Sequence, residues 1–229
     1  MLRQLRTPRA AALAGVIFAL LFGAVLVLIR TKMPEGHAGS AEWLDSRESG
    51  IGAATKLMPF AGISVLWFIG VIRDGLGRYE DKFFSSVFLG SGLLFLAMMF
   101  VSTSVAAGLV ASNGQVADAA AHAATVDFGK MVVLAASKTY AVRMAAVFMM
   151  SLATIWLRTG LMPRWLVGLS YLAAVGLLAA SDLSMWITLV FPVWVLIVSG
   201  LLLVRAGLFE ELKIGDHVAE RNTSAEPGA

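Results

Sequence analysis

The chain has 229 residues, of which 59% are hydrophobic, and it carries a net charge of +3 with a mean hydropathy of +0.81. Soluble domains are less apolar than this, and several apolar runs reach the roughly 18–20 residues that cross a bilayer as a helix. The chain contains no cysteine, which excludes disulfides, thiolate catalysis, iron–sulfur clusters and cysteine-type zinc sites. The composition predicts an all-α, polytopic membrane helical bundle with six transmembrane helices.

The first predicted span covers residues 10–29 and follows a basic start with Arg3, Arg6 and Arg9. It is too long for a signal peptide and lacks a small-residue cleavage motif, so we expect a retained helix. Small residues recur along it at every fourth position, namely Ala11, Gly15, Ala19 and Gly23. This spacing predicts a helix-packing seam that another helix approaches closely, although small residues are common in membrane helices generally.

The second and third predicted spans cover residues 52–72 and 83–110. A polar segment with room for a short interfacial helix near residues 41–46 precedes them, and Pro59 is expected near the first turns of the second span. The turn between the two spans is densely charged, with Arg73, Asp74, Arg78, Glu80, Asp81 and Lys82. Its charges cancel, which favours a cytoplasmic topological turn and leaves open a role as a docking turn for a partner.

The fourth predicted span covers residues 139–157, after an alanine-rich segment that is a candidate interfacial helix over residues 112–130. Arg143 falls inside this span, where an ionisable side chain is a functional candidate. Two interpretations stand: Arg143 extends to the outer headgroups, or it forms an intramembrane pair with Asp182. Upstream, the spacing of Asp118, His122 and Asp127 is too weak a signal to predict a metal site.

The fifth and sixth predicted spans cover residues 165–181 and 185–204, and a polar tail over residues 206–229 is expected to be disordered. Gly160 suits a helix C-cap, and Pro163 suits the first turn of the next helix. Pro192 is expected to kink the sixth span. In the third span, the hydroxyls of Ser102, Thr103 and Ser104 are expected to bond their own backbone or a neighbouring helix.

Six spans place both termini on one side of the membrane. With the N-terminus inside, eleven of the eighteen basic residues fall in short inner segments: Arg3, Arg6, Arg9, Arg73, Arg78, Lys82, Arg158, Arg164, Arg205, Lys213 and Arg221. Positive charge concentrates on the cytoplasmic side of membrane proteins. The sequence therefore predicts a plasma-membrane protein with both termini cytoplasmic.

Two segments carry a resemblance. The run PFAGISVLWFIGVIRDGLGRYEDKFFSSVFLGSGLLFLAMMF, residues 59–100, resembles a family of small actinobacterial multi-pass integral membrane proteins. The run YAVRMAAVFMMSLATIWLRTGLMPRWLVGLSYL, residues 140–172, is similar to the same group. The family has no assigned biochemical function, so the resemblance implies a multi-helix membrane fold and nothing catalytic.

No constellation of catalytic residues, cofactor-binding motif or metal-ligand set emerges from the sequence. We therefore expect a non-enzymatic accessory or scaffold subunit, whose partners are the lipid bilayer and other membrane proteins or further copies of itself, with no nucleic acid. The alternative is a small transporter or permease for an ion or small organic molecule, in which Arg143 would meet an anionic substrate and Pro59 and Pro192 would mark mobile helices.

Overall fold

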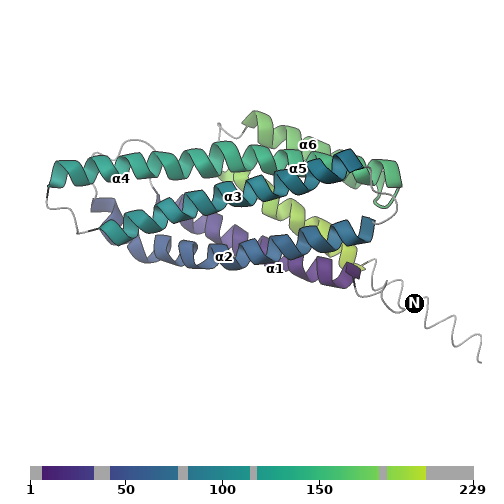
Figure 1. Cartoon of the computed structure of the whole chain (residues 1–229), viewed down its shortest axis with the longest axis horizontal. Helices are drawn as coiled ribbons and strands as arrows, with labels where there is room; N and C mark the ends of the chain where they lie inside the picture. The colour runs from purple at the N-terminus through teal and green to yellow at the C-terminus, as the bar shows by residue number, and fades with distance from the viewer. Residues whose placement is uncertain (1–6, 34–41, 77–81, 114–117, 181–184, 205–229) are drawn as a thin grey trace, which may run out of the picture.

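The computed structural model describes residues 7–33, 42–76, 82–113, 118–180 and 185–204, and the regular elements in these ranges are all helical. In chain order they are α1 (Thr7–Lys32), α2 (Glu42–Leu76), α3 (Lys82–Ser112), α4 (Ala119–Leu134), the π-helical segment η2 (Ala135–Ala141), α5 (Val142–Thr159), α6 (Arg164–Ala180) and the 3-10 segment η3 (Met185–Leu189). A last α-helix over residues 190–204 follows η3 directly. Figure 1 shows an elongated bundle in which most helices follow the long axis.

Because α4, η2 and α5 form one uninterrupted helix of 41 residues, the described ranges fold into six helical rods. Five of the six are long and apolar enough to cross a membrane, and α6 is the shorter one. The predicted all-α fold is confirmed. Every predicted span falls within one rod, except that residue 181 lies outside the described ranges.

Two rods begin earlier in the chain than the predicted spans. α2 starts at Glu42, so residues 42–46 of the expected short helix are part of α2 and not a separate element. Pro59 therefore lies in the middle of α2 rather than near its start. The fourth rod starts at Ala119 instead of residue 139. Its run of alanines favours helix, and the Asp118 carboxylate caps it by accepting a hydrogen bond from the Ala120 amide at 3.0 Å.

The turn between α5 and α6 follows the sequence prediction closely. Gly160 adopts a left-handed conformation with φ 65°, and its amide donates to the Trp156 carbonyl at 2.9 Å, so the predicted glycine C-cap is confirmed. Pro163 lies one residue before α6, where its carbonyl accepts the Leu166 amide at 3.0 Å.

Pro192 lies in the first turn of the last helix, where its missing amide hydrogen is not needed for the helical ladder. The backbone changes from 3-10 to α geometry at Val190, two residues before the proline, and the kink expected at Pro192 stays a prediction.

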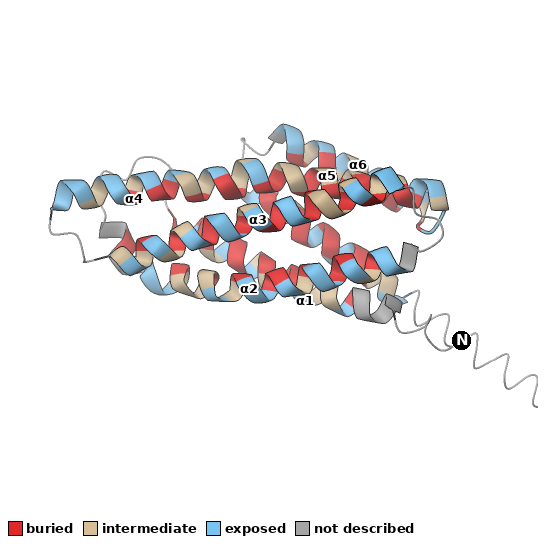
Figure 2. Ribbon diagram, viewed as in Figure 1, coloured by how far each residue is buried: buried red, intermediate tan, exposed pale blue. Residues whose placement is uncertain are grey.

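The last helix turns one face into the core of the bundle and leaves the other exposed. The Phe191 ring lies 4.8 Å from Phe95 of α3 and 5.9 Å from both Phe18 of α1 and Phe148 of α5, measured between ring centroids. The aromatic cluster consists of Phe18, Phe22, Phe88, Phe95, Phe148, Trp156, Phe191 and Trp194. Figure 2 shows the buried residues along the inner faces of the rods, where this cluster fills the core.

The outer faces of the rods carry large apolar side chains. Among the most exposed are Leu20, Phe60, Trp67, Leu94, Leu172 and Val193. A water-soluble monomer rarely exposes so much apolar surface. The bundle is therefore apolar both inside and out, as expected of helices surrounded by lipid.

Candidate functional site

Four exposed basic residues mark one end of the bundle. Arg73 lies near the end of α2, Lys82 starts α3, and Arg158 and Arg164 flank the turn between α5 and α6. The Arg158 guanidinium lies 4.7 Å from the centre of the Phe84 ring, which joins the end of α5 to the start of α3 through a cation–π contact. We call this end of the molecule the basic end.

The predicted docking turn is at the same end. Arg73, Asp74 and Lys82 are all exposed to the surroundings of the protein. The other three members, Arg78, Glu80 and Asp81, lie outside the described residues. The docking role therefore stays a prediction.

Arg143 lies in the first turn of α5, directly after the π-helical segment. Its side chain is half-buried, and Nη1 donates to the Thr139 carbonyl one turn earlier at 3.2 Å. Asp182 lies outside the described residues, so the proposed pair between Arg143 and Asp182 stays a prediction.

A buried polar contact joins α3 to α4 beside the π-helical segment. The carbonyl oxygen of Val133 accepts two hydroxyl donors, Ser102 from α3 at 3.0 Å and Ser137 from η2 at 2.7 Å, and both serines are buried. Thr103 instead bonds the Met99 carbonyl of its own helix at 2.9 Å. The two modes expected for these hydroxyls, to the own backbone and to a neighbouring helix, are both confirmed.

The polar residues of α4 act in capping and ion pairing. Asp118 caps the helix, and Asp127 lies 3.7 Å from the Lys130 ammonium. His122 is half-buried on the same helix. Within the described ranges, no group of three or more His, Asp or Glu side chains is placed to hold a metal ion.

Two buried cations were not singled out by the sequence. Arg30, near the end of α1, and Lys130, in α4, are only 6% and 3% exposed. Hydropathy does not reveal which face of a helix a charge occupies, so it gives no sign that either side chain is buried. The single signal available was the spacing of Asp127 and Lys130, three residues apart on one helix.

The predicted helix-packing seam of α1 is closely packed at one glycine. A Cβ atom at Gly15 would collide with Ser199 Oγ of the last helix and would lie 2.8 Å from the Phe68 ring of α2. Ala19 is buried, whereas a Cβ atom at Gly23 would meet no described atom within 4 Å beyond its own stretch of helix. The side chain of Ala11 lies outside the described part.

Further hydrogen bonds connect α6 to its neighbours. The Trp194 indole nitrogen of the last helix donates to Ser170 Oγ at 2.8 Å, and the hydroxyls of Thr154 and Tyr171 lie 2.6 Å apart. Ser170 is fully buried and itself donates to the Leu166 carbonyl. These contacts hold the shortest rod against α5 and the last helix.

Replacement of Ser170 by alanine should lower the unfolding free energy by about 1 kcal/mol, because the buried Trp194 N–H loses its acceptor. Reversible unfolding in mixed detergent micelles measures this change. Ser151→Ala is the matched control, since Ser151 is also buried but bonds only the Val147 carbonyl of its own helix among the described contacts. Equal losses for the two variants would contradict a special role for the inter-helix bond.

The described residues thus define an all-helical bundle in which five helices are long and apolar enough to cross a membrane. No protein-family model, curated protein or solved structure matches the chain at a significant level.

Proposed function

We propose that the chain is a six-span integral membrane protein of the plasma membrane, with both termini cytoplasmic, that acts as a non-enzymatic accessory or scaffold subunit. The observation that carries this proposal is the combination of an aromatic core and an apolar outer surface. Since the core is filled by rings from four helices, the surface available to partners is the outside of the bundle. We also propose that the chain belongs to the family of small actinobacterial multi-pass membrane proteins that residues 59–100 and 140–172 resemble.

The orientation is supported by the basic end. Arg73, Lys82, Arg158 and Arg164 are exposed there beside a single exposed acidic residue of the described part, Asp74. Positive residues at helix ends favour the cytoplasmic side. We therefore assign the basic end to the cytoplasm and the opposite end, where α1 ends and α4 begins, to the outer side.

The alternative of a small transporter rests on Arg143, which is half-buried next to a π-helical segment. A central pathway would have to pass the rings of Phe95, Phe148 and Phe191, whose centroids are 4.8–5.9 Å apart where they meet. Such rings leave no room for a hydrated substrate unless they move. The aromatic packing thus favours the accessory or scaffold role.

The mass of the detergent-solubilised particle tests this role. We expect the protein, extracted in mild detergent from its native membrane, to migrate in complexes with more than one copy or a second membrane protein, so that the protein mass exceeds the 24.3 kDa of one chain. Light scattering with detergent correction, or native mass spectrometry, gives that mass. A strictly monomeric species after cross-linking in the membrane would refute the proposal.

A further inference from the structure

The fourth rod is far longer than a bilayer requires. Its 41 residues extend over about 60 Å at 1.5 Å per residue, against a hydrocarbon thickness of about 30 Å. About 20 residues cross that thickness, so a count from Arg158 at the basic end reaches Lys138 inside η2. If the bundle is embedded as proposed above, α4 lies beyond the hydrocarbon on the outer side.

The neighbouring helices give the same boundary. A count of about 20 residues from Lys82 along α3 reaches Ser102, and the same count from Arg73 along α2 reaches Ala53, close to the exposed Lys56. Ser102 donates to the Val133 carbonyl, and so does Ser137, the residue next to Lys138, so the counts along α3 and along the fourth rod end beside one observed contact. The start of α2 and the end of α3 therefore lie beyond the hydrocarbon, as α4 does.

The boundary coincides with the π-helical segment. A π-helical turn widens the helix and interrupts the regular ladder of i to i+4 hydrogen bonds, which makes it a local weak point. Here the Val133 carbonyl, at the start of this region, is bonded by the two hydroxyls of Ser102 and Ser137. Of these two, only Ser102 belongs to another helix.

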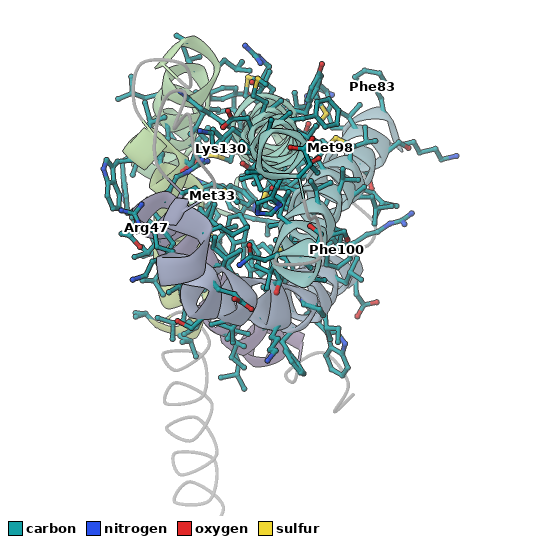
Figure 3. The ribbon with its side chains drawn as sticks, turned by 90° about the vertical axis from the view of Figure 1, so that its left-hand side faces the viewer. Met33, Arg47, Phe83, Met98, Phe100 and Lys130 are labelled. Carbon is teal, nitrogen blue, oxygen red and sulfur yellow. The ribbon has the colours of Figure 1, made fainter. Side chains whose placement is uncertain are left out.

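α4 packs on one side and is open on the other. Its inner face is in close contact with α3, where a Cβ atom at Gly129 would lie 2.6 Å from the Leu109 side chain. Its outer face exposes Phe128 and Met131. Under the inner face lies Lys130, which Figure 3 shows on the side of α4 toward Met33 and Arg47, and which is 3% exposed.

We propose that α4 is a hinged lid over the outer end of the bundle, which pivots at η2 and is latched to α3 by the hydrogen bond from Ser102 to the Val133 carbonyl. Opening of the lid exposes the inner face of α4, with Val126 and the Lys130 ammonium, to water. The lid proposal depends on the membrane embedding proposed above, and the experiment below tests the lid and the embedding separately.

The chain has no cysteine, so single cysteines report on accessibility without background. Open membrane fragments that contain the full chain are treated with a membrane-impermeant maleimide. Val126→Cys, which replaces a residue 1% exposed on the inner face of α4, is the reporter for lid opening. Adding Ser102→Ala should raise its labelling rate about fivefold, the factor expected for loss of one buried hydrogen bond.

Thr103→Val is the matched control, because it removes a neighbouring buried hydroxyl that bonds its own helix. It should leave the Val126→Cys rate unchanged. An unchanged rate in Ser102→Ala, or an equal rise in Thr103→Val, would overturn the latch. Labelling of Met149→Cys, a fully buried position in α5, in the Ser102→Ala background would indicate global loosening and would also overturn it.

Two further cysteines separate the lid from the embedding. Thr125→Cys, on the exposed face of α4, should label rapidly, whereas Leu94→Cys, on the exposed apolar face of α3, should stay unlabelled. No labelling at either position would agree with the embedding but would refute a lid that lies outside the hydrocarbon. Rapid labelling at both would refute the embedding itself.

Discussion

Replacement of Phe191 by alanine should lower the unfolding free energy by about 3 kcal/mol, a large loss for a single truncation. Phe191 contacts rings of α1, α3 and α5 and stacks on Trp194 of its own helix at 6.2 Å. The unfolded helices remain in an apolar bilayer, so the cost comes mainly from lost packing and the cavity left behind rather than from water. Reversible unfolding in mixed micelles measures it.

Phe60→Ala is the matched control for this truncation. Phe60 is 61% exposed on the outer face of α2, so its loss should change the unfolding free energy by less than about 0.5 kcal/mol. The same pair of variants separates the proposed role from transport. If a pathway ran through the core, Phe191→Ala would widen it and increase solute flux into proteoliposomes, and such an increase would contradict a purely structural core.

The rods themselves were predictable from the sequence because apolar runs of membrane length leave the chain few alternatives to helices. The Gly160 cap was predictable for a similar reason, since a glycine after an apolar run and before a proline is a local signal. The start of the fourth rod at Ala119 was not predictable by hydropathy. Histidine and aspartate lower the hydropathy of residues 118–130 while the alanines favour helix, so the segment was recognisable as a candidate helix but not as a continuous part of the fourth rod.

The polar contacts were less accessible to sequence analysis. A π-helical segment of seven residues leaves no signature in the hydropathy pattern, and the predicted fourth span begins at residue 139, inside η2. The serine patch around Ser102 was recognised, but its acceptor is the Val133 carbonyl, a backbone atom 31 residues further along the chain. Which backbone atom a hydroxyl meets depends on helix rotation, and a single sequence does not specify that rotation.

The small-residue spacing of α1 predicted a face but not which glycine on it meets a neighbour. Gly15 faces Ser199 and Phe68, whereas the space beside Gly23 is open within the described structure. Both glycines belong to the same helix and to the same four-residue repeat. The difference arises because the last helix passes α1 at Gly15, and this crossing point is a property of the folded bundle.

Gly15→Ala should therefore lower the unfolding free energy by about 1–3 kcal/mol, because the added methyl group forces Ser199 and the Phe68 ring apart. Gly23→Ala, on the same helix with open space around it, should be neutral or stabilising by up to about 1 kcal/mol through its higher helix propensity. Unfolding of the two variants in the same micelles gives the comparison. Equal effects at the two glycines would contradict the observed crossing of the helices.

A second substitution identifies the atom responsible. Ser199 Oγ is buried and has no hydrogen-bond partner in the described part of the chain, so Ser199→Ala alone should cost little. Combined with Gly15→Ala it removes the closest atom and should restore about half of the lost stability, a non-additivity that two independent sites would not show. Strict additivity in this cycle would mean that the cost at Gly15 comes from Phe68, and that α1 is held against α2 rather than against the last helix at this point.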